Sequence, residues 1–182
     1  MPAVTHVDVT RPPSRSGSGM RRALRDHLGS RDVARVVYGA IIGLAFVVAL
    51  GQHPPTAAQA VGGIIATAMA VALAEIYSEY VGEEARERRR PGRKEIRVFV
   101  EDAAAVAFGA GFPAVFFVLS AVGLIEVDLA FKLAKWTGLG LICAYGYAAA
   151  RLAGHDFGRA LMHMAAVGAV GAALILVKAL LH

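Results

Sequence analysis

Long apolar runs constrain this chain more than any other feature. Five of them follow one another, each near the length of about 20 residues that a membrane-spanning helix needs, at residues 33–51, 57–81, 99–125, 129–152 and 159–181. With 57% hydrophobic and 18% charged residues, the chain is too apolar for an ordinary soluble domain. The sequence therefore predicts an all-α, polytopic membrane domain over residues 33–182, preceded by a disordered basic tail over residues 1–32.

Helix-breaking and polar residues separate the runs. The first run ends at "GQHPPT", residues 51–56, because proline cannot continue a helix. A charged segment, residues 82–98, follows the second run and is expected to form a short cytoplasmic loop. The sequences "EVD" at 126–128 and "AGHDFG" at 153–158 mark the next two turns. Gly111 and Pro113 lie inside the third run.

The basic residues predict the orientation. Of the 19 Lys and Arg residues, all but Lys132, Lys135 and Lys178 lie in the tail up to Arg35, in the segment 82–98 or beside the loop that follows the fourth run. Cytoplasmic loops carry the excess of Lys and Arg. Five spans then place the N-terminus inside and the C-terminus outside. Small residues at Gly39 with Gly43, Gly62 with Ala66, and Gly168 with Gly171 indicate close helix packing.

Several classes of function are not favoured by the sequence. It contains no nucleophile–base pair, phosphate-binding loop or CxxC motif, so we expect no enzyme. The single cysteine, Cys143, cannot form a disulfide within the chain. The arginines at 88–90 have no aromatic residues between them, which argues against nucleic acid and favours contact with a lipid bilayer.

Acidic residues recur where the second run meets the charged segment. Glu75, Glu79 and Glu83 are spaced four residues apart, so on a helix they form one stripe. Clusters of carboxylate oxygens suit divalent cations, and an ionisable residue inside a span is a functional candidate. The alternative is that these carboxylates pair with the arginines that follow them.

Each of the other candidate metal ligands has an alternative role that is purely structural. Glu101 and Asp102 are either a second pair of metal ligands or acidic residues that favour a helix N-terminus. His155, Asp156 and His163 are either ligands for a borderline metal or polar loop residues. Met69, like the other methionines, is either a metal ligand or a packing residue.

Four motifs, taken in order, resemble the vacuolar iron transporter family over residues 31–182. "RVVYGAIIGL" at 35–44 resembles its first-helix G-A-N-D-G-L pattern, and "AEIYS" at 74–78 resembles its second-helix G-E-Y-V-S pattern. "AAAVAFGAGFPAVFFVL" at 103–119 resembles its third helix, and residues 146–181 resemble its last loop and glycine-rich fifth helix.

The resemblance implies a homodimeric transporter of iron(II) or manganese(II), driven by proton exchange and without a tightly bound cofactor. The metal would cross between the first two helices of the two protomers. Glu75 matches the family's second-helix Glu, and Met69 lies two residues from the position of its methionine. Glutamates such as Glu83 would collect metal on the cytoplasmic side. We expect a bacterial plasma membrane as the location.

The chain departs from the family pattern at two places. Ile41 and Ile42 stand where the family has Asn-Asp, and the segment 82–98 is too short for the family's metal-binding domain. Without the Asp, the first span is expected to offer only Tyr38 and backbone to a cation. Two functions therefore stay open: a divalent-metal transporter that works through Glu75 and Glu79, and a non-transporting membrane scaffold or interaction protein that keeps the family fold.

Overall fold

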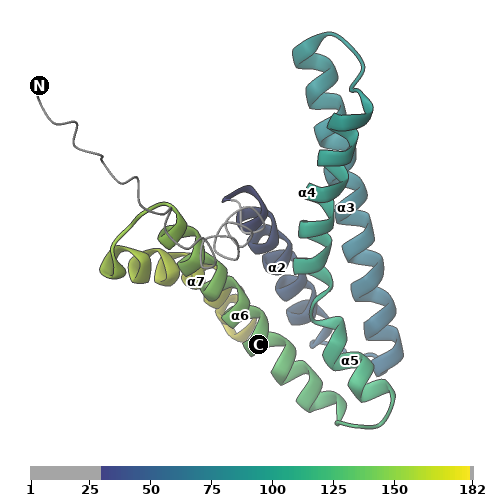
Figure 1. Ribbon diagram of the computed structural model, residues 1–182. Helices are drawn as coiled ribbons and strands as arrows, with labels where there is room; N and C mark the ends of the chain where they lie inside the picture. The colour runs from purple at the N-terminus through teal and green to yellow at the C-terminus, as the bar shows by residue number, and fades with distance from the viewer. Residues whose placement is uncertain (1–29, 181–182) are drawn as a thin grey trace, which may run out of the picture.

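The computed structural model describes residues 30–180, and every regular element in that range is a helix. The elements in chain order (Figure 1) are α2 (Ser30–Leu50), α3 (Ala57–Glu87), α4 (Arg93–Gly111), α5 (Ala114–Ala121), α6 (Val127–Leu152) and α7 (Phe157–Leu180). The all-α class expected from the sequence is confirmed for this range. Most of the expected basic tail and the end of the fifth run lie outside the described residues.

Two helices in the described chain are long and apolar enough to cross a membrane, namely Val33–Leu50 within α2 and the whole of α3. A third candidate span forms if α4 and α5 are taken together, although they are bent by 51° relative to each other. The bend falls at Pro113, because proline lacks the N–H that a continuous helix needs. The helices therefore fit a membrane protein with two to three clear spans.

Helix α6, the fourth expected span, is not among these candidate spans. Helix α6 carries Asp128, Lys132 and Lys135 in its first turns and Arg151 in its last, with Gly and Tyr residues between them. In α7, the segment Phe157–Ala173 is an apolar helix, and the end of the fifth expected span lies outside the residues whose side chains are described.

The segment 82–98 is mostly helical, which corrects the expected loop. Helix α3 continues to Glu87 and α4 begins at Arg93, so that only five residues, Arg88–Gly92, connect them. The segment is rich in Glu and Arg, which are good helix formers. In Figure 1, α3 and α4 run side by side as a long hairpin whose connecting turn extends beyond the other helices.

Charged side chains close the turn of this hairpin. The Glu95 carboxylate accepts a hydrogen bond from the Gly92 N–H at the start of α4. It also pairs with Arg89, whose Nη1 lies 3.0 Å from Glu95 Oε2. The hydrogen bond from Arg89 and that from the Gly92 backbone lower the pKa of Glu95 to about 2. A carboxylate at a helix N-terminus is also favoured by the helix dipole.

Glycines bring α2 and α4 into backbone contact. A Cβ added at Gly39 would overlap the Val106 carbonyl, and one added at Gly43 would lie 2.6 Å from the Ala110 oxygen. Gly109 of α4 makes the reciprocal close approach to the α2 backbone near Val36. This is the close packing that the small residues of the first run predict.

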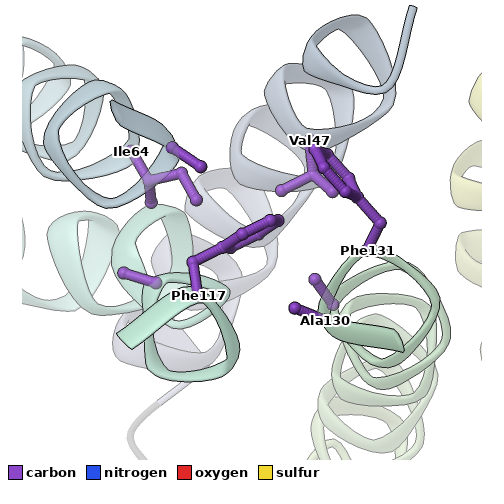
Figure 2. Packing of buried hydrophobic residues seen from close by; sticks show 8 residues of the cluster. Val47, Ile64, Phe117, Ala130 and Phe131 are labelled. Carbon is purple, nitrogen blue, oxygen red and sulfur yellow. The ribbon is translucent and has the colours of Figure 1, made fainter. Parts of the chain in front are cut away.

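Aromatic and aliphatic side chains fill the end of the bundle that lies opposite the α3–α4 turn. Phe117 of α5 is fully buried and meets Phe131 of α6 edge to face, with ring centroids 4.7 Å apart. Figure 2 shows these two rings beside Val47 of α2 and Ile64 of α3, so that four helices meet in one cluster. The contact fixes the bent α4–α5 pair against its neighbours.

Small residues also join α6 and α7. A Cβ on Gly168 would lie 2.7 Å from Cys143 Sγ, and one on Gly171 would lie 2.9 Å from Leu139 Cδ1. The pair Gly62 and Ala66 differs, since both residues are exposed and a Cβ on Gly62 would meet no atom within 4 Å. The face of α3 that carries Gly62 and Ala66 is therefore exposed in the described chain.

Candidate functional site

The central feature of the site is Arg35, which lies in the second turn of α2 and reaches two other helices. Its Nη1 donates a hydrogen bond to Glu75 Oε1. Its Nη2 lies 2.8 Å from Glu79 Oε1 on α3 and 2.8 Å from Asp102 Oδ2 on α4. These four residues are called the Arg35 cluster below. One guanidinium thus connects three helices through three carboxylates.

The local sequence explains why the four side chains converge. Glu75 and Glu79 are four residues apart and therefore lie on one face of α3. Arg35 precedes Gly39 by four residues, and Asp102 precedes Val106 by four residues. Since Gly39 contacts Val106, Arg35 and Asp102 face each other one helical turn away from that contact.

The cluster is largely shielded from solvent. The exposed fraction is 14% for the Arg35 side chain and 8% for that of Asp102, and it rises to 21% for Glu75 and 30% for Glu79. Arginine suits this position because its planar fork offers five N–H donors, which a lysine cannot match. In the described chain, no buried side-chain nitrogen or oxygen is without a hydrogen-bond partner.

The cluster holds more acidic than basic groups. Three carboxylates face one guanidinium. A single ion pair would be enough to neutralise Arg35. The additional carboxylates provide oxygen donors of the kind that hard divalent cations bind.

The other predicted ligands lie outside the cluster. Glu83 pairs with Arg86 at 2.9 Å, which is the ion pair that the alternative interpretation expects. Glu101 is exposed and pairs with Arg97 at 2.8 Å. Met69 is 61% exposed, and its position six residues before Glu75 places it about 120° away around α3. The structure therefore brings together Glu75, Glu79 and Asp102 from the predicted set.

The helix boundaries correct one of the alternative interpretations. Glu101 and Asp102 were candidates for acidic residues at a helix N-terminus, but α4 begins at Arg93. Both residues therefore lie in the interior of α4. The acidic residue in its first turn is Glu95.

Arg35 is the site residue that the sequence interpretation missed. It was counted with the basic tail as a signal of orientation, and the first span was expected to offer only Tyr38 and backbone. Arg35 adds no metal ligand to this span, because a guanidinium has donors and no acceptor; it instead supplies a cation to all three carboxylates, while Tyr38 is 51% exposed. Its position two residues inside the first apolar run was the available signal, since an ionisable residue there needs a partner.

His155 of the α6–α7 loop and His163 of α7 lie close together without a third ligand. The rings of His155 and His163 are stacked, with centroids 5.1 Å apart and planes 11° apart. Asp156 instead accepts a hydrogen bond from the Arg159 backbone N–H at 3.3 Å. Among the residues that the structure describes, no three His, Cys, Asp or Glu side chains are grouped so that they could hold a metal ion.

Comparison with protein-family models, with curated proteins and with solved structures finds no match to this chain. Any functional conclusion therefore rests on the geometry of the site and on the sequence motifs.

Proposed function

We propose that the protein is an integral membrane transporter of divalent metal ions, iron(II) or manganese(II), that exchanges them for protons at the Arg35 cluster. The observation that carries this proposal is the convergence of three carboxylates. Glu75, Glu79 and Asp102 converge from two helices on one guanidinium. Carboxylates near a bilayer are costly, and a purely structural ion pair needs only one of them.

The length of α3 supports a position for the cluster at one membrane surface. Its 31 residues span about 46 Å at 1.5 Å per residue, which exceeds a hydrocarbon core of about 30 Å. Glu75 and Glu79 lie about 27 Å and 33 Å along α3 from Ala57. With five spans and the N-terminus inside, the cluster stands at the cytoplasmic mouth of the bundle.

Arg35 then acts as the resident counterion of an acidic entrance. An arriving divalent cation competes with the guanidinium for the same oxygens, so the ion and Arg35 occupy the carboxylates in turn. Oxygen donors match the preference of manganese(II), and they also bind iron(II). Carboxylates that have released a metal can take up protons in its place, which gives the exchange a chemical basis.

A second candidate function rests on the same ion pairs. Arg35 already pairs with each carboxylate of the cluster, and the described residues contain no three-ligand group for a metal. A non-transporting membrane scaffold would use Arg35 only to hold α2, α3 and α4 together. Under that function, neutralising a carboxylate changes stability and nothing else.

Uptake of metal into liposomes separates the two functions. We would measure iron(II) and manganese(II) entry with and without a pH gradient, for the unchanged protein and for Glu75→Gln and Glu79→Gln. Glu83→Gln is the matched control, since Glu83 pairs with Arg86 outside the cluster. Saturable uptake that is lost in the first two variants and kept in the control supports transport. No flux above empty liposomes from folded protein supports the scaffold.

We also propose that the protein is a homodimer in a bacterial plasma membrane, and the exposed face of α3 supports the homodimer. Gly62 and Ala66 lie on this face, followed by Met69, Leu73 and Tyr77, whose exposed fractions are 61%, 64% and 71%. Small residues let two helices approach closely in lipid, where the hydrophobic effect gives no drive for association. A second protomer packed against this face would place two Arg35 clusters in one assembly.

A further inference from the structure

An apolar groove lies between α2, α6 and α7, and none of the four Arg35-cluster residues lines it. Its volume is about 390 Å³, which falls within the range of about 300–1,000 Å³ typical of small-molecule sites. The walls are formed mainly by small and aliphatic residues, among them Val33, Val37, Gly146, Ala150 and Val167. The polar side chains that line it are those of His155 and His163.

The mouth of the groove carries basic groups. The stacked imidazoles of His155 and His163 stand at one edge, and His163 also borders an adjoining hollow of about 350 Å³ with Arg159. Arg151 Nη1 donates a hydrogen bond to the His155 carbonyl oxygen at 3.2 Å. Asp156 lies 3.9 Å from Arg159 Nε and offsets one of these charges. The mouth thus keeps an excess of N–H donors and positive charge.

An apolar groove with a basic mouth matches one class of ligand, an amphiphile with an anionic head. A metal ion is a poor fit because the described residues provide no third ligand beside the histidines. The chain's own N-terminal segment is also a poor fit, since five of its first 29 residues are arginines and like charges repel. Imidazole and guanidinium groups form charge-assisted hydrogen bonds with phosphate oxygens.

The groove lies at the end of the bundle that we expect to face the cytoplasmic leaflet, where anionic lipid is abundant. Val33 and Val37 belong to the first turns of α2, so the groove lies at the same end of the bundle as Arg35. The excess of basic residues places this end on the cytoplasmic side, where the leaflet is rich in anionic lipid. We infer that the groove binds one acyl chain of an anionic phospholipid and that His155, His163 and Arg159 hold its phosphate.

Native mass spectrometry of the detergent-purified protein tests this site. Phosphatidylglycerol and phosphatidylcholine of equal chain length are titrated separately into the protein, and the fraction of protein with bound lipid is measured. We expect about tenfold tighter binding of phosphatidylglycerol, because it carries a net negative charge, whereas the choline ammonium of phosphatidylcholine offsets the charge of the same phosphate. Inorganic phosphate, which has the charge but no acyl chain, is expected not to displace the bound lipid.

Two variants test the binding of the lipid headgroup and of the acyl chain separately. The double variant His155→Gln with His163→Gln should lose the preference for phosphatidylglycerol but still bind lipid. Ala34→Phe should weaken the binding of both lipids, because Ala34 lines the groove from an exposed position where a larger side chain disturbs no core. His53→Gln is the matched control, since His53 is exposed in the α2–α3 loop.

Three results would overturn the inference. The first is equal affinity of the unchanged protein for the two lipids. The second is an unchanged preference in the double histidine variant, provided that circular dichroism shows it to be folded. The third is displacement of the lipid by millimolar inorganic phosphate, which would make the basic mouth a site for free anions.

Discussion

Arg35 Nη2 lies 2.8 Å from Asp102 Oδ2, one helical turn away from the closest contact between α2 and α4. The glycine contact fixes the distance between the two helices, and the ion pair fixes which residues face each other. Because both side chains are largely shielded from solvent, neither can lose its partner without cost. The pair therefore connects the packing of the bundle to the electrostatics of its candidate site.

The first prediction compares the two members of this pair. Arg35→Ala removes the guanidinium that pairs with all three carboxylates, and we expect it to lower the free energy of unfolding by about 3–5 kcal/mol. Asp102→Asn keeps the size of the side chain and leaves Glu75 and Glu79 to neutralise Arg35, so we expect a loss of about 1 kcal/mol. Unfolding in detergent micelles, followed by circular dichroism, measures both. A larger loss for Asp102→Asn would contradict the central role given to Arg35.

The second prediction concerns the glycine contact between α2 and α4. Gly39→Ala would place a methyl group into the Val106 carbonyl and separate the two backbones. We expect a loss of about 1–3 kcal/mol, as for other overpacked positions. Gly140→Ala in α6 is the control, since its Cβ meets nothing within 4 Å and alanine favours a helix by about 1 kcal/mol. Equal thermal stability of the two variants would show that α2 and α4 do not pack as described.

The third prediction follows from the pKa of Glu95 at the tip of the α3–α4 hairpin. Arg89 and the Gly92 N–H lower this pKa from its ordinary value of 4.5 to about 2. A lowered pKa means that the ionised form favours the folded hairpin. Its contribution is fully present above about pH 4.5 and is lost as the pH falls toward 2.

Carbon-13 NMR of the Glu95 carboxyl group in detergent micelles would measure this titration directly. We expect its midpoint near pH 2 in the unchanged protein. In Arg89→Ala the pKa should move upward, because the larger of the two hydrogen-bond contributions is gone. Arg93→Ala is the control, since Arg93 has no described contact with Glu95. A midpoint at the ordinary value in the unchanged protein would rule out the closed turn.

The helical class and the helix breaks could be predicted from the sequence because they follow from local residue patterns. The proline-rich segment after Leu50 ends α2, and Pro113 bends the third apolar run, as the fixed proline ring requires. The segment 82–98 was less predictable. Its charges indicated a loop, yet Glu and Arg are also good helix formers, and the pairing of α3 with α4 extends both helices.

The candidate site could be predicted only in part. The four-residue spacing placed Glu75 and Glu79 together, since that relationship is local to one helix. The contribution of Asp102 and Arg35 depends on how three helices pack, which no spacing within a single run reveals. Arg35 also serves two physical roles at once, because the same charge that biases orientation neutralises the carboxylates.

The last prediction tests the proposed homodimer on the exposed face of α3. Gly62→Leu and Ala66→Leu would hold a second α3 helix away from this face, since close approach in lipid depends on small residues. We expect each to raise the dimer dissociation constant by about tenfold or more, measured by sedimentation equilibrium in detergent. Gly140→Leu, at an equally open position on α6, should leave association unchanged. A monomeric unchanged protein, or equal dissociation constants for all four proteins, would refute this interface, because its small residues would then face only lipid.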